Sequence, residues 1–516
     1  MQLCGIDADF ESLGSSPPVW RARVAAAEWV ATASFAQAAG LPLVSIWGVD
    51  RRDTDGHFDI CAAYAADQGL AWLMLALDPA QPRYPDLSGY FPAARRMQRA
   101  VADLMGLAAD GAEDRRPWLR HGAWPADYFP LCREHDGLET FADAIAEDYA
   151  VVQVQGDGVH EIAVGPVHAG IIEPGHFRFS VVGEKVLRLE ERLGYTHKGI
   201  EKLLERTAPA DGHRIAGRVS GDSTVAYAWA YCMALESATG ITLPESALLQ
   251  RALMLERERV ANHMGDLGAL GNDAGFAFGL AQFSRLKEDW LRINKLAFGH
   301  RFMMDGIVPG GVAVPLDQTR CSTLALQCDR VGEEVGELYA IYDEHAGLQD
   351  RFIGAGRVLP ADASRLGLGG MVGRASGQGR DLRCDQAWRP YDSLGVNKVT
   401  LQNGDVAARV KLRFEELLES LRLIRHMCAL IADLPTPTLI PMQPAGQCAG
   451  LGWVEGWRGQ VLVALEIDGD KIKRCHCHDP SWQNWPVLEH AIIGNIVPDF
   501  PLINKSFNLS YSGHDV

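Results

Sequence analysis

Two histidines and one glutamate fall within nine residues of a turn that is punctuated by glycine and proline, in "GPVHAGIIEPGHFRF". His168, Glu173 and His176 are residue types that relay protons, because histidine titrates near neutrality and burial raises the pKa of a glutamate toward that range. The same side chains also suit a turn in which they cap backbone groups. The residues alone leave both interpretations open, and their composition favours the capping one.

A second stretch, "GRVSGDSTVAYAWAY" (217–231), has the frame of a metal-binding helix start, in which a short turn leads into an apolar helix. Where such a frame places thiolates, this chain carries Ser220 and Ser223, whose hydroxyls are hard donors that stay protonated at neutral pH. The chain's 11 cysteines form no Cys-x-x-Cys pair. "CHCHD" (475–479) alternates its cysteines and histidines on opposite faces of a strand, which disfavours a closed tetrahedral site, so we expect no metal there.

Other sequence features are less specific. The glycine-rich "GLGGMVGRASGQGR" (367–380) predicts a loop that lies close to a ligand or to another backbone, and His263 of "ERVANH" favours a structural role. The net charge of −17 disfavours a nucleic-acid partner. The start of the chain is not typical of a signal peptide, and no run of about 18 apolar residues occurs. We therefore expect a soluble protein that reaches a membrane only through partners.

The pattern of apolar residues predicts an α+β fold with two domains. A small N-terminal α+β domain spans 1–135, with strands in 41–66 and 70–78 and a helix in 90–107, and a polar linker follows at 136–150. The second domain, 151–516, opens with strands in 151–166 and 176–192. Long apolar stripes at helical spacing predict a bundle of helices, and the chain returns to strands before a last helix at 484–495.

Six segments in one order carry a family resemblance: "GPVHAGIIEPGHFRF", "GYTHKGIEKLLE", "MLERERVANHMGDLG", "GRASGQGRD…WRPYD", "EGWRGQ" and "DPSWQNWP". This order resembles the large subunit of membrane-bound nickel-iron hydrogenases and the 49-kDa-type subunit of respiratory complex I. The "GIIEPGHF" version is similar to the energy-converting group, the formate hydrogenlyase and hydrogenase-4 type. "FPAARRMQRAVADLMGL" and "DRRPWLRHGAWPADYFPL" resemble the complex I 30-kDa-type subunit, and the fusion of the two is a feature of formate hydrogenlyase-type enzymes.

The resemblance also shows what this chain has lost. Active relatives hold nickel and iron with four thiolates from two Cys-x-x-Cys pairs. The first pair matches "RVSGDS", at Ser220 and Ser223, and the second matches "SFNLSYSG", at Ser510 and Gly513. The resemblance thus implies a variant that lacks all four ligands and binds no metal. The sequence ends at Val516, and we expect no extension for a maturation protease to cut.

Quinone reduction of the complex I type is not transferred residue for residue. The quinone-binding tyrosine of that pattern falls at Gly221, and the second histidine of its turn is replaced within 173–175. Tyr227 and Tyr231 lie further along the same helix as candidate substitutes.

Several residues keep a role that the resemblance implies. Glu173 and His168 are candidates for proton transfer or for lining the former pocket. Asp222 is a candidate for the same roles, although it is new relative to both family patterns. The basic pair His197 and Lys198 is expected beside an iron–sulfur cluster of a partner, and Glu455 and Arg458 are expected to flank the former metal position. A buried ion pair or a cap would explain each of these matched side chains equally well.

The expected function is that of a peripheral-arm subunit of a complex on the cytoplasmic side of a membrane. Such a subunit would bind no cofactor itself and would couple electron transfer to proton or ion movement. The expected partners are an iron–sulfur small subunit of the complex I 20-kDa type, a ferredoxin-like subunit, and quinone-site-like and antiporter-like membrane subunits. The alternative is a non-catalytic structural or regulatory subunit, and an active nickel-iron hydrogenase is the least favoured.

Overall fold

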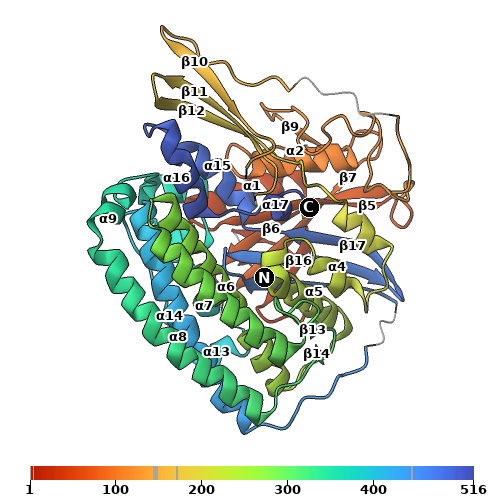
Figure 1. Ribbon diagram of the computed structural model, residues 1–516. Coiled ribbons are helices and arrows are strands. Elements are labelled where there is room, and N and C mark those ends of the chain that lie inside the picture. Colours follow the sequence, from red (N-terminus) through yellow and green to blue (C-terminus); the bar gives the residue numbers. More distant parts are fainter. Residues whose placement is uncertain (1, 4, 143–148, 170–171, 387, 443–445) are drawn as a thin grey trace.

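The computed structural model spans residues 1–516 and describes all of them except 1, 4, 143–148, 170–171, 387 and 443–445 (Figure 1). Part of the predicted linker 136–150 therefore lies outside the described residues. The chain mixes helices with several small sheets, so the predicted α+β class is confirmed. Among the described helices, none is both long and apolar enough to cross a bilayer.

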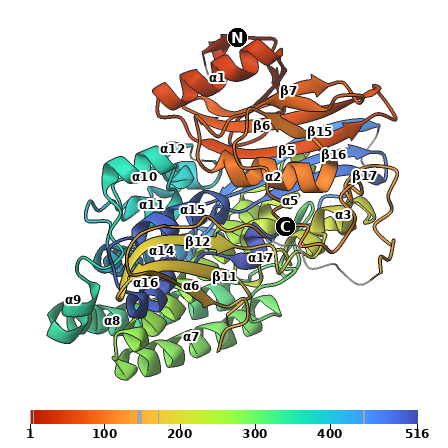
Figure 2. The same cartoon turned by 90° about the horizontal axis from the view of Figure 1, so that it is seen from above.

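The N-terminal part is built on a five-stranded sheet in the order β3-β4-β7-β6-β5, in which only the β4–β7 pair is parallel. The predicted buried strands are confirmed, because nearly every residue of β5, β6 and β7 is buried. In Figure 2, α1 lies above this sheet and α2 below it. The elements are β1 (Gln2–Leu3), β2 (Ile6–Asp7), β3 (Glu11–Ser12), β4 (Val19–Arg23), α1 (Ala26–Ala38), β5 (Leu43–Arg51), β6 (His57–Ala66), β7 (Gly69–Leu77), β8 (Arg83–Pro85), α2 (Ala94–Met105) and β9 (Ala108–Asp110).

A three-stranded antiparallel sheet opens the second part of the chain, with β10 (Val159–Val164), β11 (His176–Val182) and β12 (Lys185–Arg192). The prediction of a strand from 151 onward is wrong for its first residues. The backbone N–H of Val152 donates to the Glu190 carboxylate at 2.8 Å, so this segment is held by a side chain in place of a neighbouring strand.

Long helices form the predicted bundle at one side of the molecule (Figure 1). Helix α6 packs against α7 and α14, and α8 packs against α14, so each buries the apolar face of its neighbour. The glycine-rich segment predicted as a loop contains the short helix α11, which buries Met371 and Val372. The elements are α3 (Ile200–Glu205), α4 (Gly212–Ala216), α5 (Thr224–Thr239), α6 (Glu245–Asp273), α7 (Ala277–Phe298), β13 (Ile307–Val308), β14 (Gly311–Val312), α8 (Gln318–Glu344), α9 (Ala346–Phe352), α10 (Pro360–Leu366), α11 (Gly370–Arg374), α12 (Leu382–Asp385), α13 (Tyr391–Leu394) and α14 (Val406–Ala432).

The last part of the chain returns to strands, as predicted. β15 (Gln447–Glu455), β16 (Gln460–Asp468) and β17 (Lys471–His478) form an antiparallel sheet against which α5 packs. Helix α15 (Ser481–Ala491) begins three residues before the predicted start, because the Asp479 carboxylate accepts the backbone N–H of Ser481 at 2.8 Å. After it come α16 (Phe500–Phe507) and α17 (Tyr511–His514).

Candidate functional site

The predicted turn-then-helix frame is present at Ser220 and Ser223. A single 3-10 turn, Gly221–Ser223, leads directly into α5, which is buried along most of its length. The first backbone N–H groups of α5 need acceptors, and the carboxylate of Glu258 on α6 accepts those of Val225 and Ala226 at 2.7 and 3.3 Å. This contact positions the start of α5, and Ser220 with it, against the central helix of the bundle.

The four positions that the resemblance matches to metal ligands come together, although 290 residues separate Ser220 from Ser510. We refer to them below as the former ligand positions. The hydroxyl oxygens of Ser220 and Ser510 are 2.9 Å apart and share a hydrogen bond, and Ser510 Oγ accepts the backbone N–H of Gly513 at 2.9 Å. Arg458 donates to Ser223 Oγ at 3.3 Å. We call Ser220, Asp222, Ser223, Arg458 and Ser510 the serine cluster.

An ion pair closes the serine cluster on one side. Two guanidinium nitrogens of Arg458 each lie 2.7 Å from a carboxylate oxygen of Asp222, which also accepts the Ser220 hydroxyl at 2.8 Å. Burial opposes ionisation of Asp222, but the charge of Arg458 outweighs it and holds the pKa of the carboxyl at about 2. The Asp222 side chain keeps 40% of its surface exposed, so the cluster has one edge that faces outward.

The residues present do not fit a thiolate-held nickel-iron centre. Three of the four positions offer hard hydroxyl donors, and those of Ser220 and Ser510 are bonded to each other. At the fourth, a Cβ on Gly513 would lie 2.5 Å from Asp479 Oδ2, so this carboxylate occupies the space of a side chain. Asp479 is held there by the Tyr227 hydroxyl, which donates to the same oxygen at 2.9 Å. Five cavities found among the described residues are lined by residues that do not belong to the serine cluster.

The turn with the two histidines reaches the serine cluster through its glutamate. Glu173 Oε2 accepts the backbone N–H of Ser512 in α17 at 3.1 Å. His168 Nε2 donates to the carbonyl of Gly175 at 2.8 Å, and His176 Nδ1 lies 3.3 Å from the carbonyl of Gly165. Burial lowers the pKa of His176. The structure therefore brings Glu173 to the former ligand segment, whereas both histidines bond to backbone within their own turn.

Tyr511, which directly follows Ser510 in the chain, packs between this turn and α15. The side chain is 7% exposed, and its ring packs edge-to-face on Trp485 with centroids 4.8 Å apart. A Cβ on Gly175 would lie 2.5 Å from the Tyr511 ring, so the glycine is what allows this close approach. The ring therefore joins the turn to α15.

The predicted basic pair lies beside the same segments. Lys198 Nζ donates to the carbonyl of Val219 at 3.1 Å, immediately before Ser220, and burial lowers its pKa. His197 Nδ1 lies 3.1 Å from the carbonyl of Asp515, which follows α17. Burial also lowers the pKa of His197. Both side chains therefore hold the backbone that carries former ligand positions.

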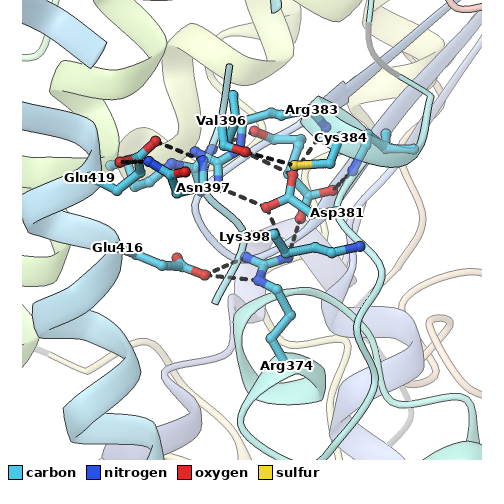
Figure 3. Close-up of polar contacts among 12 residues, drawn as sticks. Arg374, Asp381, Arg383, Cys384, Val396, Asn397, Lys398, Glu416 and Glu419 are labelled. Carbon is cyan, nitrogen blue, oxygen red and sulfur yellow. Dashed lines mark hydrogen bonds and ion pairs between the residues drawn. The ribbon is translucent and has the colours of Figure 1, made fainter. Parts of the chain in front are cut away.

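Glu455, predicted to flank the former metal position, belongs instead to a set of charges that we call the buried ion network: Arg374, Asp381, Arg383, Glu416 and Glu455. Arg374 lies 2.7 Å from Glu416, 2.8 Å from Glu455 and 3.6 Å from Asp381, and Arg383 lies 2.7 Å from Asp381. Figure 3 shows Arg374 between Glu416 and Asp381. This network could not be predicted from the sequence, because Glu416 and Glu455 are far along the chain from the segment that carries Arg374, Asp381 and Arg383.

His263 has the structural role that was favoured for it. Its side chain is fully buried, its Nε2 lies 3.1 Å from Glu416, and its ring packs edge-to-face on Trp457. Trp457 in turn donates to the backbone carbonyl of Asp222 at 2.9 Å. His263 and Trp457 therefore join the buried ion network to the serine cluster.

The "CHCHD" segment lies on β17 at the contact between the two parts of the chain. His476 Nε2 is 2.7 Å from Ser45 Oγ on β5, and its Nδ1 is 2.7 Å from Glu201. This is the hydrogen-bond order of a hydrolytic triad. Ser45 is only 1% exposed, however, and the cavity beside it holds about 40 Å³, room for a few waters and for no organic substrate. We interpret these hydrogen bonds of His476 as a contact between the two parts of the chain, which was not predicted from the sequence.

One group of possible metal ligands occurs among the described residues, at Asp50, Cys132 and Glu134. Arg52 forms ion pairs with both carboxylates, so a guanidinium already supplies the positive charge between them. Burial raises the pKa of the Cys132 thiol to about 12, which disfavours the thiolate that a metal needs. We interpret Asp50 and Glu134 as partners of Arg52 in ion pairs beside the N-terminal sheet.

Comparison with known proteins supports the same order of segments. Residues 22–140 match the family model of the respiratory-chain NADH dehydrogenase 30 Kd subunit, residues 273–444 match that of the 49 Kd subunit, and residues 198–266 match nickel-dependent hydrogenase. Formate hydrogenlyase subunit 5 of Escherichia coli (strain K12) is 32% identical over 485 residues, which cover 91% of this chain and 84% of the relative. The chain belongs to this hydrogenase and complex I subunit family. Hydrogenase-4 component G of the same organism is 30% identical over 479 residues, covering 91% of this chain and 83% of that protein.

A solved structure has the same fold. One chain of the membrane-bound sulfane sulfur reductase, an archaeal respiratory membrane complex, superposes with a TM-score of 0.66 at 22% identity. The match covers 70% of this chain and 99% of that chain. The hydrogenase family model includes Ser220 and Ser223, whereas Ser510 and Gly513 lie outside the three matched ranges.

Proposed function

We propose that this chain is the peripheral-arm subunit of a membrane-associated, hydrogenase-related oxidoreductase complex that works without a nickel-iron centre. In this proposal the electrons pass through iron–sulfur clusters of a small partner subunit and a ferredoxin-like subunit. The chain couples that transfer to quinone-site-like and antiporter-like membrane subunits, which move protons or another ion. It is held on the cytoplasmic side of the membrane by these partners and binds no cofactor itself.

The observation that carries the proposal is the closed hydrogen-bond cluster at the former ligand positions. Ser220 and Ser510 are bonded to each other, Asp222 and Arg458 neutralise each other, and Asp479 occupies the space beside Gly513. A protein that retained nickel would need soft donors in this place. The cluster supports a subunit whose metal site has been replaced by a polar contact between α5 and α17.

The same cluster supports a coupling role, because it connects an exposed carboxylate to the buried helix start. Glu173 is exposed and holds Ser512 of α17, and α17 is capped by Ser510, which bonds Ser220 at the start of α5. A partner that protonates or displaces Glu173 would act directly on α17. A shift of α17 would change the Ser220–Ser510 contact and with it the Asp222–Arg458 pair.

A second candidate, a non-catalytic structural or regulatory subunit, is favoured by Tyr511. Its buried ring packs between the Gly175 backbone and Trp485 next to Ser510, as expected of a segment that now only holds elements together. An active nickel-iron hydrogenase is the least favoured, because both the donor set and the packing at Gly513 oppose it.

Metal analysis of the complex purified with its partners tests the proposal. We expect iron from the partner clusters, no stoichiometric nickel, and no hydrogen uptake with a viologen acceptor. One nickel per chain would overturn the proposal.

Glu173→Gln and Asp222→Asn in the assembled complex, reconstituted into vesicles, then separate the two candidates. Loss of proton or ion movement with unchanged assembly supports coupling. Unchanged ion movement in both variants supports the structural subunit.

A further inference from the structure

A cavity of about 350 Å³ lies between the two parts of the chain, away from the serine cluster. One wall comes from the N-terminal part, from Gly40–Val44 and Tyr90–Ala93. The other comes from α10 and the residues after it, Ala363–Gly370, and from the start of α15. Ligand sites commonly form at domain interfaces and have volumes from about 300 Å³ upward. An apolar cavity of about 150 Å³ holds benzene, so this volume suits a body of two aromatic rings.

The floor of this interdomain cavity is apolar. Leu41, Leu43, Phe91, Leu366 and Leu368 line it, and four of them are buried. Phe91 is half-buried and lies at the N-terminal wall. A flat apolar body would pack against these side chains and bury its own apolar surface there, which is the main source of affinity in small-molecule sites.

The charged residues that line the interdomain cavity are both arginines. Arg365 and Arg380 line it, and none of its lining residues is an aspartate or a glutamate, although the chain carries 66 acidic residues against 49 Lys and Arg. Arg380 Nη2 donates to the carbonyl of Gly40 at 2.9 Å, which uses one of its five N–H donors and fixes the guanidinium across the domain boundary. Arg365 Nη2 donates to Asp362 Oδ1 at 3.0 Å in an exposed ion pair, which leaves its other N–H donors for a ligand. Two exposed guanidinium groups over an apolar floor favour an anionic head on the ligand.

Neutral polar groups complete the lining. Gln483 donates to the backbone carbonyls of Val44 and Leu43 at 2.5 and 3.3 Å, and its Oε1 lies 3.1 Å from His478 Nε2. Burial lowers the pKa of His478 to about 3, so the ring is neutral at physiological pH and donates to Gln483. The two arginines are therefore the charges that a ligand meets in this cavity.

We propose that the interdomain cavity is a binding site for a small organic anion with a flat apolar body of about two rings. The apolar floor takes the body, and Arg365 and Arg380 bind its sulfonate, carboxylate or phosphate group. This inference goes beyond the proposed function and does not depend on it.

One lining residue of the interdomain cavity packs against the backbone of a serine-cluster residue. Gly370 lines the cavity and has a positive φ of 62°, and a Cβ on it would lie 1.8 Å from the carbonyl oxygen of Arg458. Arg458 is the residue that pairs with Asp222. The glycine at this position therefore allows the cavity wall to contact the Arg458 backbone directly.

Fluorescence titration of the full chain with 5-(dimethylamino)naphthalene-1-sulfonate, a two-ring probe, tests the site. N,N-dimethyl-1-naphthylamine, the same ring system without the sulfonate, is the matched probe. We expect saturable binding of one sulfonate probe per chain and roughly tenfold weaker binding of the neutral probe, because charge-assisted bonds to arginine are lost. Displacement by 1-naphthoate or by 1-naphthyl phosphate shows which head group the arginines prefer.

Surface variants connect the binding to the interdomain cavity. Arg365→Gln with Arg380→Gln should reduce the affinity for the sulfonate probe to that for the neutral probe. Ser364→Trp, at an exposed lining position on α10, should abolish binding of both. The controls Arg357→Gln and Ser322→Trp change exposed residues outside the lining and should bind like wild type. Absence of saturable binding, or wild-type affinity in Ser364→Trp with an unchanged melting temperature, would overturn the proposal.

Discussion

Two polar regions inside this protein adjoin each other and hold their groups in different ways. The serine cluster has three hydroxyls and a single ion pair, and Asp222 keeps 40% of its side chain exposed. In the buried ion network, every charged side chain is at most 4% exposed, and Arg374 faces three carboxylates. A buried charge is costly when its partner is removed, whereas a hydroxyl contact contributes about 1 kcal/mol. The comparison indicates that the buried ion network contributes more to the stability of the fold than the serine cluster does. Residues of the serine cluster can therefore be exchanged at a smaller cost in stability.

The largest effect is expected in the buried ion network. Arg374→Met leaves Glu416, Glu455 and Asp381 without their shared cation, so we expect the free energy of unfolding to fall by about 3–5 kcal/mol. Urea unfolding followed by circular dichroism measures this. The control Arg292→Met removes an exposed ion pair with Glu288 and should stay within about 1 kcal/mol of wild type. Equal effects of the two variants would contradict the role given to the network.

The pH dependence of stability tests Glu258, which holds the start of α5 beside the serine cluster. Burial is the main cause that raises the pKa of this carboxyl to about 8, and the charge of Asp222 adds to it. The folded state then binds more protons than the unfolded state between the ordinary glutamate pKa and about pH 8. Stability is therefore lost as pH rises through this window, by up to about 1.4 kcal/mol per pH unit.

Glu258→Gln should flatten this pH dependence between pH 5 and 8, since the amide does not titrate and its single oxygen can keep the shorter bond, from the N–H of Val225, while the longer one from Ala226 is lost. Urea unfolding at several pH values measures the slope. Glu245→Gln, at the exposed start of the same helix, is the matched control and should keep the wild-type slope. An unchanged slope in Glu258→Gln would show that this carboxyl is already ionised in the folded protein.

Introducing cysteines at the four matched positions tests whether missing thiolates are the only reason why the serine cluster would not bind nickel. Gly513→Cys places a side chain against Asp479, so we expect a loss of about 1–3 kcal/mol of stability from overpacking. Adding Asp479→Ala should recover part of this loss in a double-mutant cycle. We also expect the variant with cysteine at 220, 223, 510 and 513 to bind no stoichiometric nickel. Additive effects at 513 and 479 would contradict the predicted clash.

The smallest effect is expected at the hydroxyl contact itself. Ser220→Ala removes the bonds to Ser510 and Asp222 but leaves the Asp222–Arg458 pair. Urea unfolding should therefore show that the free energy of unfolding falls by about 1 kcal/mol. Ser322→Ala, at an exposed position on α8, is the control and should lie within about 0.5 kcal/mol of wild type. A loss as large as that of Arg374→Met would mean that the serine cluster also holds the fold.

The sequence alone determined the elements of this protein and its family. The apolar runs of β5–β7 and the helical stripes of α6, α7 and α14 predict these elements, because burial of one face imposes a period of two or 3.6 residues. The turn before α5 could be predicted from the sequence as well, whereas the matched ligand positions were implied by the family resemblance and by no periodic pattern. Periodicity identifies the buried face, but it does not identify the residue that lies opposite.

Only the tertiary structure decided the partners of the residues at the site. Ser220 meets Ser510 across 290 residues, Asp222 meets Arg458 across 236, and the space of a side chain at Gly513 belongs to Asp479. Glu455 proved to be part of the buried ion network, and His263 joins that network to Trp457. Such contacts depend on how α5, α6, α14 and β15 pack against one another. Their distances follow from the packed chain, and no local pattern in the sequence contains them.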